Sequence, residues 1–339
     1  MKALVLAGGF ARRLGPIGEN LPKAMLVEED SSILDLILKK LHEAGIEAYI
    51  STNRKFADYF NGYKNLIIEE TTKEEEKLGA VSAINHAIKT AGINEDLLVI
   101  CVDNYFSDDL KDLIAGYSGN PAVGVYYIGG RSDMKAEELG SVKFDGSDSY
   151  PPARRIFAIT DFKEKQKPPL SSYVAAGVYV FPKRLFPVID EFCRGQKRDA
   201  PGTLVQHLIE RGEKVMGYLL SGTWYDVSHK SYLTAFSDAR LVKCDERYIV
   251  CDKALSEHFV ASITILKPGK HTTGHSHPVA EAYFFVGGVG EIETDEGRRK
   301  TVGPKDVVLI KPNEFHRVYN TGRSLLIFVS AFERYGERG

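Results

Sequence analysis

The strongest constraint on the fold is a change in the sequence pattern near Cys244. Up to about residue 236, short apolar runs alternate with segments whose apolar residues recur at helical spacing. After Cys244, short strand-like runs are separated by glycine and proline turns, without a helical period. The first pattern predicts an α/β domain with a mostly parallel, doubly wound, Rossmann-like sheet, and the second predicts an all-β sandwich or barrel. The 339 residues suffice for two such cores.

The periodicity places the elements of both parts. The first part is expected to open with a strand over residues 2–7 and a helix over residues 33–44. Further strands are expected at 48–52, 66–69 and 97–102, helices at 81–91 and 201–211 with Asp199 as a cap of the last, and barrel strands at 259–266, 282–286, 307–310 and 325–331. A helix over residues 230–241 is expected to join the halves, with domains at 1–236 and 247–335 and a linker at 237–246.

Charge and composition exclude several classes of function. The formal net charge of −2 provides no basic field for nucleic acid or anionic lipid. No apolar run is as long as a membrane span, and the N-terminal apolar stretch is broken by Gly8-Gly9 and followed by arginines, unlike a signal peptide. We therefore expect a cytoplasmic protein that binds neither nucleic acid nor membrane. The four cysteines show no CxxC spacing and are expected to be free thiols.

The N-terminal end of the chain has the pattern of a phosphate-binding site. An apolar strand leads into Gly8-Gly9, where the backbone can approach a ligand that a side chain would exclude. Arg12, Arg13 and Lys23 follow and supply fixed positive charge. Together they favour a site for a polyphosphate that also reacts there. A dinucleotide site of the Rossmann type is the alternative, but the GxGxxG pattern is absent and Lys23 has no role in it.

Asp103 is the candidate ligand of a magnesium ion, because it directly follows a continuous apolar run. Open α/β sheets bind ligands beyond the carboxyl ends of their strands, which is also where Gly8-Gly9 fall. A carboxylate that faces a phosphate loop there can hold Mg²⁺, and Arg13 and Lys23 can neutralise phosphate oxygens. Phosphoryl-type transfer requires mainly positioning and charge neutralisation, so this set is chemically sufficient for it.

Residues 1 to about 236 resemble the sugar-phosphate nucleotidylyltransferases, such as glucose-1-phosphate thymidylyl- and uridylyltransferases. The signature of that family is two glycines, a turn, Arg-Leu, a proline and then Pro-Lys, matched here by Gly8, Gly9, Arg13, Leu14, Pro16, Pro22 and Lys23. Ala11-Arg12 replaces the usual Gly-Thr. Further segments match in the same order: Leu78-Gly79-Ala80, Val102-Asp103-Asn104, Glu164-Lys165, Gly177-Val178-Tyr179 and Trp224-Tyr225-Asp226. Several ordered matches are far more specific than one glycine turn.

The resemblance implies an enzyme that transfers a nucleotidyl group from a nucleoside triphosphate (NTP) to a hexose 1-phosphate, yielding an NDP-sugar and pyrophosphate. It implies catalytic roles for Arg13 and Lys23 on the triphosphate, and for Asp103 and Asp226 as ligands of Mg²⁺. It also implies nucleotide contacts from Leu6, Gly8, Gly9, Arg13, Leu78, Gly79 and Asp103, and sugar-phosphate contacts from Gly140, Glu164, Lys165 and Gly177. Neither the base nor the sugar can be read from the sequence.

The second part of the chain contains a group of histidines and one carboxylate that could bind a metal together. His275 and His277 are two positions apart, as residues on one face of a strand are. Glu281 follows on the same hairpin, and His316 is expected from a later strand. Three imidazoles and a carboxylate suit a divalent transition metal such as Zn, Fe, Mn, Ni or Co. Residues 247–333 resemble the cupins, a family of all-β jelly-roll barrels. The resemblance rests on those four residues together with Gly269, Gly288, Pro312 and Asn320.

Two roles for a cupin barrel remain as alternatives. TTGHSH and Glu281-Ala282-Tyr283 are similar to cupin-type phosphoglucose and phosphomannose isomerases, which favours a bifunctional chain whose barrel isomerises a hexose phosphate. A bound metal and Glu281 would then act at C1 and C2 of the sugar. The alternative is a sensor without catalysis, in which the first domain binds a sugar nucleotide and the barrel serves regulation or dimerisation. A homo-oligomer formed through the barrel is expected.

Overall fold

A computed structural model describes the chain except for residues 130, 132–133, 153, 196–199 and 336–339. The chain divides into two compact units, which are described separately below. Unit 1 contains residues 1–9 and 37–227, and unit 2 contains residues 10–36 and 228–339. Residues 10–36 therefore group with the C-terminal part of the chain, although they precede most of unit 1 in the sequence.

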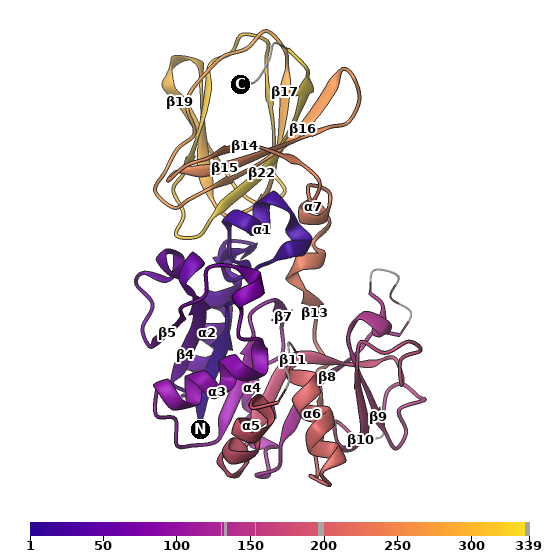
Figure 1. The fold of residues 1–339 in the computed structure, drawn as a ribbon. Helices are drawn as coiled ribbons and strands as arrows, with labels where there is room; N and C mark the ends of the chain where they lie inside the picture. Colours follow the sequence, from indigo (N-terminus) through magenta and orange to yellow (C-terminus); the bar gives the residue numbers. More distant parts are fainter. Residues whose placement is uncertain (130, 132–133, 153, 196–199, 336–339) are drawn as a thin grey trace. The chain divides into compact units, whose positions relative to one another are not determined.

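The centre of unit 1 is a large sheet (Figure 1). Its strands are β1 (Lys2–Leu6), β4 (Ala48–Asn53), β5 (Leu66–Glu69), β6 (Leu97–Cys101), β8 (Ala122–Tyr127), β9 (Gly140–Phe144), β10 (Ile156–Glu164), β11 (Tyr173–Phe181) and β12 (Met216–Leu219). Their order is β5-β4-β1-β6-β11-β8-β12-β10-β9. A separate two-stranded ribbon pairs β7 (Asn104–Phe106) with β13 (Trp224–Asp226).

The α/β class is confirmed, but only part of the sheet is parallel. β5, β4, β1 and β6 run parallel to one another, as do β8 and β12. The remaining pairs are antiparallel, so the mostly parallel sheet predicted from the sequence is a mixed one. The connections explain this difference. Among the described residues no α-helix lies between β9, β10 and β11, and strands joined without a crossover helix pair antiparallel.

Strand β6, in the middle of this sheet, is covered on both faces. The α-helices found in the described residues are α1 (Pro16–Asn20), α2 (Ile33–Glu43), α3 (Ala80–Thr90), α4 (Leu110–Ala115), α5 (Phe186–Cys193), α6 (Pro201–Glu210) and α7 (Ser231–Thr234). In unit 1, α3, α5 and α6 pack beside one another over Leu97 and Val99 (Figure 1). Leu98 and Ile100 alternate with them and are also fully buried, so β6 is covered on both faces, as predicted. The predicted cap of α6, Asp199, lies outside the described residues.

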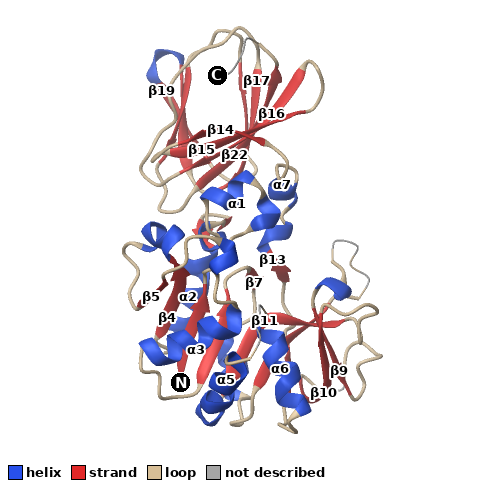
Figure 2. Cartoon of the chain, viewed as in Figure 1, coloured by secondary structure: helices blue, strands red, loops and turns tan. Residues whose placement is uncertain are grey.

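Unit 2 contains an all-β barrel made of two sheets, as predicted (Figure 2). Its strands are β14 (Arg240–Cys244), β15 (Tyr248–Ala254), β16 (Phe259–Leu266), β17 (Glu281–Gly287), β18 (Gly290–Thr294), β19 (Arg298–Val302), β20 (Val307–Ile310), β21 (His316–Asn320) and β22 (Leu326–Glu333). One sheet has the order β14-β15-β16-β22-β17-β20 and the other β19-β18-β21. Apolar side chains from both sheets, including Phe285, Ile292 and Phe328, form one buried core.

Residues 10–36 add short elements to unit 2. These are two 3₁₀ turns, η1 (Arg12–Leu14) and η2 (Lys23–Met25), the helix α1, and a hairpin of β2 (Val27–Glu28) and β3 (Ser31–Ser32). α1 lies against β14 and β15 of the barrel, and η1 lies against α7. None of the described helices of the chain is long and apolar enough to cross a membrane.

The helix expected over residues 230–241 is wrong in its second half. Helix α7 ends at Thr234, and Arg240–Cys244 is strand β14, antiparallel to β15. Leu241 pairs with Cys251 in that ladder. The barrel sheet therefore satisfies the backbone of this segment and overrides its local helical pattern. The four cysteines are free, as expected.

Candidate functional site

Two acidic residues lie on adjacent backbone segments beyond the carboxyl end of β6. Asp103 lies just past β6, and Asp226 ends β13. In the antiparallel β7–β13 ribbon, Asp226 stands opposite Asn104, the residue after Asp103. The carbonyl oxygen of Asp103 also accepts a hydrogen bond from the N–H of Val227 at 2.8 Å. The ribbon thus brings together the two residues that were expected to bind Mg²⁺.

Asn104 connects this acidic pair to the large sheet. Its Nδ2 donates to Asp103 Oδ1 at 2.8 Å, and its Oδ1 accepts from Trp224 Nε1 at 3.1 Å. Trp224 is fully buried and also donates to the carbonyl oxygen of Ala176 at 3.1 Å. Gly177 follows with a φ of +74°, and a Cβ there would lie 2.4 Å from Asn104 Nδ2. Position 177 requires glycine because Asn104 approaches it so closely.

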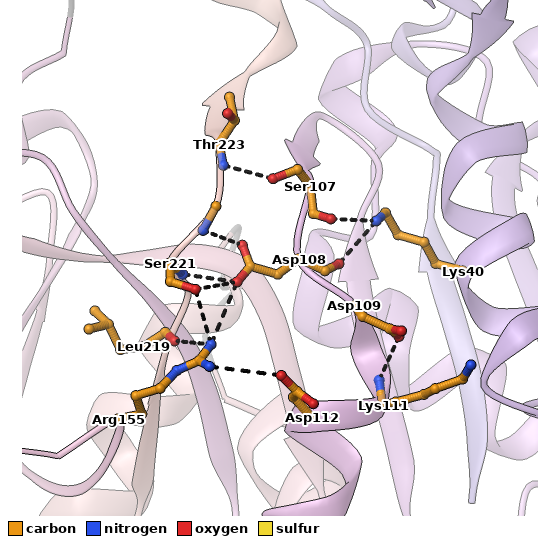
Figure 3. Close-up of polar contacts among 11 residues, drawn as sticks. Lys40, Ser107, Asp108, Asp109, Lys111, Asp112, Arg155, Leu219, Ser221 and Thr223 are labelled. Carbon is orange, nitrogen blue, oxygen red and sulfur yellow. Dashed lines mark hydrogen bonds and ion pairs between the residues drawn. The ribbon is translucent and has the colours of Figure 1, made fainter.

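A second group of polar contacts holds β13 beside β7 (Figure 3). Asp108 Oδ1 accepts from the backbone N–H of Ser221 at 2.9 Å, and its Oδ2 accepts from that of Gly222 at 2.8 Å. Ser107 Oγ accepts from the N–H of Thr223 at 2.8 Å. The segment that enters β13 is therefore tied to the segment that leaves β7. Asp108 could not be identified from the sequence, because the three residues of β7 before it are too few to form a recognisable strand pattern.

Residues expected to contact the sugar phosphate gather around the end of β10. Glu164 is the last residue of that strand. A Cβ at Gly140 would lie 2.9 Å from Glu164 Oε2, and a Cβ at Gly202 would lie 2.1 Å from it. Burial raises the pKa of Glu164, and the charge of Lys165 opposes that shift. The two glycines thus leave the room that this carboxylate occupies.

Tyr179 is a buried tyrosine on β11, the strand that also carries Gly177. Burial raises its pKa far above the ordinary value, and the charges of Cys101, Glu164 and Asp103 add to that shift.

The nucleotide contacts predicted within unit 1 lie at the carboxyl ends of its parallel strands. Leu6 ends β1, and the carbonyl oxygen of Gly8 accepts from Asn53 Nδ2 at 2.9 Å. A Cβ at Gly9 would meet no described atom within 4 Å, so the backbone there is open to a ligand. Gly79 precedes α3 with a φ of +85°, which favours glycine at this turn.

Glu69 is a buried acid near these loops, and its sequence context does not distinguish it. Its side chain accepts from Ser51 Oγ at 3.1 Å, and its Oε1 lies 3.5 Å from the position of a Cβ on Gly8. Burial raises the pKa of Glu69, although hydrogen bonds from Ser51 and from the backbone of Leu78 oppose the shift. Glu69 therefore contacts Leu78 and approaches the glycine turn. At the end of the apolar run LIIEE it looks like an ordinary solvated acid.

The two predicted phosphate-binding cations belong to unit 2. Arg13 lies in η1, and Lys23 begins η2. Ala11, where the sequence departs from the family signature, adopts a left-handed φ of 50° just before η1. Arg13 Nη1 lies 3.3 Å from His229 Nε2. An arginine can only donate, so Nε2 of His229 accepts this hydrogen bond.

The four predicted metal ligands come together in the barrel. His275, His277, Glu281 and His316 each offer one ligand atom, and these atoms all lie within 4.8 Å of one another. His275 and His316 exchange two backbone hydrogen bonds, at 3.1 and 2.9 Å, which join the two distant segments. His275 is exposed, whereas the other three ligands are buried. A ligand entering from solvent would therefore meet the cluster at His275.

Hydrogen bonds define the state of each imidazole in this cluster. The Nδ1 atoms of His275, His277 and His316 lie 3.2, 2.9 and 3.1 Å from the carbonyl oxygens of Thr273, Val279 and Glu314. A carbonyl only accepts, so each Nδ1 donates, and Nε2 is the nitrogen that can bind a metal. His316 Nε2 is buried, and Glu281 Oε2 of the same cluster lies 3.5 Å from it. A buried nitrogen in that state fits a metal ligand.

Glu281 supplies the negative charge of the cluster. Its Oε2 lies 2.9 Å from His277 Nε2 and 3.5 Å from His316 Nε2, and it accepts from the Tyr283 hydroxyl at 3.2 Å. Burial raises the pKa of Glu281, but its contacts with His316, Ser330 and His277 outweigh burial and bring the pKa to about 2. The group is a carboxylate at neutral pH, which is the form that binds a divalent metal.

Comparisons with known proteins match each part of the chain to a protein family. The nucleotidyl transferase family matches residues 2–240, and the cupin domain family matches residues 262–332. Bifunctional protein GlmU of Methanocaldococcus jannaschii is 28% identical over 233 residues, which are 67% of this chain and 51% of that protein. A bifunctional sugar-1-phosphate nucleotidylyltransferase/acetyltransferase of Sulfurisphaera tokodaii is 23% identical over 230 residues, 67% of this chain and 52% of that protein. The chain thus spans about half the length of these relatives.

Solved structures show the same fold. A UDP-glucose pyrophosphorylase complexed with UDP-glucose matches with a TM-score of 0.54 and 19% identity, over 69% of this chain and 95% of that one. A UDP-glucose pyrophosphorylase from Acinetobacter baumannii matches with a TM-score of 0.54 and 19% identity, over 70% and 91%. The family match extends over more than half of the chain and includes the glycine turn, Asp103 and Asp226. This chain therefore belongs to the nucleotidyl transferase family, with a cupin barrel at its C-terminal end.

Proposed function

We propose that the chain transfers a nucleotidyl group from an NTP to a hexose 1-phosphate and releases pyrophosphate. The observation that carries this proposal is the β7–β13 ribbon, which sets Asp226 opposite Asn104 and hence next to Asp103. Membership of the nucleotidyl transferase family supports it. The printed name of the Sulfurisphaera relative, a sugar-1-phosphate nucleotidylyltransferase, favours a sugar 1-phosphate as the acceptor.

Each predicted residue has a defined task in this reaction. Arg13 and Lys23 bind oxygens of the triphosphate and stabilise the charge that develops during transfer. Glu164 accepts hydrogen bonds from sugar hydroxyls, and Lys165 binds the sugar phosphate. The phosphate nucleophile is already ionised at neutral pH, so the site needs no general base.

Asp103 and Asp226 fit a magnesium ion by their chemistry. Mg²⁺ is usually held by one or two carboxylates together with substrate phosphates. When bound, the ion would neutralise charge on the triphosphate. Asn104 holds Asp103 Oδ1, and the N–H of Val227 holds the Asp103 backbone. These contacts position the carboxylate before any substrate binds, which lowers the cost of reaching the reactive arrangement.

Pyrophosphate release tests this proposal directly. The full chain is incubated with Mg²⁺, each of the common NTPs, and glucose or mannose 1-phosphate, and release is expected for at least one pair. Asp103→Asn and Lys23→Met should lower the rate by roughly 10²-fold or more. Asp145→Asn, at an exposed acid, is the control. Full activity in both site variants would contradict the proposal, and the active pair identifies the base and the sugar.

For the barrel, we propose that His275, His277, Glu281 and His316 hold a divalent transition metal, and that the site isomerises a hexose phosphate. The Tyr283 hydroxyl favours proton-transfer chemistry, because it donates to Glu281 at 3.2 Å and so sets a proton donor next to the metal ligands. Metal-loaded protein is assayed with hexose 6-phosphates, and His275→Ala is the matched variant. Absence of isomerisation in the metal-loaded wild type would leave the barrel with a binding role alone.

We also propose that two copies of the chain associate through the barrel. β20 is the edge strand of the six-stranded sheet, and Val307 and Leu309 on it are 63% and 65% exposed. Phe284, paired with Val307 on the neighbouring strand, is 45% exposed. An edge strand with an apolar outer face can pair with its own copy about a twofold axis. Sedimentation should show a dimer in the wild type and a monomer in Leu309→Lys.

A further inference from the structure

The segment that carries the predicted phosphate-binding cations is built into unit 2 together with the barrel. Residues 10–36 group with residues 228–339 by their contacts. Within that unit, α1 packs on the barrel strands β14 and β15, and η1 packs on α7. Arg13 and Lys23 are therefore positioned by residues from the C-terminal third of the chain, which lie far from them in sequence.

Two glycines show how closely this segment is packed. A Cβ at Gly15 would lie 1.9 Å from the carbonyl oxygen of Ser237. A Cβ at Gly287, the last residue of β17, would lie 2.3 Å from Val27 Cγ2. Such distances leave no room for a side chain at either glycine, so close packing fixes the segment both before and after Lys23.

Hydrogen bonds attach the β2–β3 hairpin to the barrel. The N–H of Gly288 donates to the carbonyl oxygen of Glu29 at 2.7 Å. Ser324 Oγ donates to the carbonyl oxygen of Asp30 at 2.6 Å, and Ser324 is buried. Both donors come from turns between barrel strands, and both acceptors lie in the turn of the hairpin. The hairpin therefore follows any movement of these barrel turns.

Lys230 ties the same hairpin to the stretch that contacts Arg13. Lys230 Nζ donates to the carbonyl oxygen of Val27 at 2.8 Å and pairs with Glu28 Oε2 at 2.5 Å. The Lys230 side chain is 15% exposed and that of Glu28 is 29% exposed, so water screens this pair less than a surface pair. His229, the preceding residue, contacts Arg13. Two consecutive residues thus touch the segment on both sides of Lys23.

We infer that Lys230 is a positioning residue for nucleotidyl transfer, acting on Lys23 and Arg13 through the hairpin and its neighbour His229. This inference rests on the proposed function, in which the two cations bind the triphosphate. Lys23 precedes Val27 by four positions, and the N–H of Leu26 donates to the Lys23 carbonyl at 3.0 Å. A displacement of the Val27 backbone is therefore expected to displace Lys23 as well. A misplacement of about 1 Å can cost roughly 10²-fold in rate.

Lys230→Met in the full chain tests the inference. The kcat for pyrophosphate release should fall about tenfold or more. The KM for the sugar 1-phosphate should stay near the wild-type value, because Glu164 and Lys165 belong to unit 1. Arg299→Met is the control. Arg299 pairs with Glu291 at 3.3 Å between β19 and β18, and neither residue belongs to residues 10–36 or to the stretch 228–239 that contacts them.

Ser324→Ala is the second variant, since it removes one hydroxyl and is the milder change if Lys230→Met fails to fold. Its kcat should fall about two- to fivefold. Equal kcat in the wild type, Lys230→Met and Ser324→Ala would overturn the inference, and so would an equal loss in Arg299→Met. If the wild type releases no pyrophosphate with any substrate pair, the proposed function fails instead. The two failures are therefore distinguishable.

Discussion

His277 Nε2 lies 2.9 Å from Glu281 Oε2, and both side chains are buried. Because Nδ1 of the same ring donates to Val279, Nε2 can face a carboxylate at this distance only with a proton or a metal cation between them. A divalent metal replaces that proton. Metal binding is therefore expected to release protons and to weaken as the pH falls.

Cobalt is a suitable probe of this site, because its visible spectrum reports the ligands. One Co²⁺ per chain should bind, with proton release measured by calorimetry in two buffers. His316→Ala removes a buried imidazole nitrogen that lies 3.5 Å from Glu281 Oε2, and it should weaken binding by about 10²-fold or more. His258→Ala, at an exposed barrel histidine, should bind like the wild type. Equal affinity in the two variants would exclude His316 as a ligand.

Gly177→Ala should disturb the position of Asp103, although it replaces neither Asp103 nor Asp226. A Cβ at Gly177 would lie 2.4 Å from Asn104 Nδ2, so Asn104 must move and release its bond to Asp103. Gly146→Ala is the matched control, since its φ of +91° gives similar backbone strain but no described atom lies within 4 Å of its Cβ. Both variants should lose about 1–2 kcal/mol from strain. The rate of pyrophosphate release should fall about tenfold in Gly177→Ala alone.

Glu69 gives a prediction about pH. Burial raises its pKa in the folded chain, so the stability from its neutral form is complete below the ordinary carboxyl pKa. That stability is lost as the pH rises through the raised value. Glu69→Gln cannot ionise, so its melting temperature relative to the wild type should rise between about pH 4.5 and pH 8.

Glu70 is the control for this experiment, because it is the neighbouring residue and its side chain is 74% exposed. Its hydrogen bond from Arg54 lowers its pKa, so Glu70→Gln should show a small change of the opposite sign. Identical pH profiles for Glu69→Gln and the wild type would mean that the buried acid ionises without cost.

The barrel ligands could be predicted because their pattern is local. His275, His277 and Glu281 lie within seven positions. The two histidines precede strand β17 and do not alternate along a strand as expected, and the bridge from His275 to His316 helps to bring the ligands together. His316 is more distant, but the closure of the barrel pairs it with His275. The glycine turn and Asp103 were likewise marked by their place after apolar strands.

Long-range packing explains what the sequence could not predict. The strands β7 and β13 have three residues each, which is too short for a period to appear. The attachment of residues 10–36 to the barrel depends on close contacts such as that of Gly287 with Val27. The sequence around these two residues does not indicate that they are in contact. Glu69 and Asp108 acquire their roles from partners on other segments.

Asp108→Asn should weaken the ribbon that holds Asp226. The Asp108 side chain is 8% exposed and accepts from the backbone N–H groups of Ser221 and Gly222. An amide retains one acceptor oxygen, so one of these N–H groups would face an NH₂ group and lose its bond, at a cost of about 1–3 kcal/mol. The melting temperature should fall by a few degrees, and pyrophosphate release about tenfold, because the backbone of Asp226 is less constrained.

Asp112→Asn provides the comparison for this variant. The carboxylates of Asp108 and Asp112 both lie 3.8 Å from the guanidinium of Arg155, but the Asp112 side chain is 68% exposed. Asp112→Asn should therefore change neither the melting temperature nor the rate of pyrophosphate release. If Asp108→Asn melts earlier yet keeps the wild-type rate, then Asp108 serves stability alone and β7 holds Asp226 without it. A loss of rate that matches the loss in Gly177→Ala would instead place the two residues in one supporting network, and the double variant should then be no slower than either single variant.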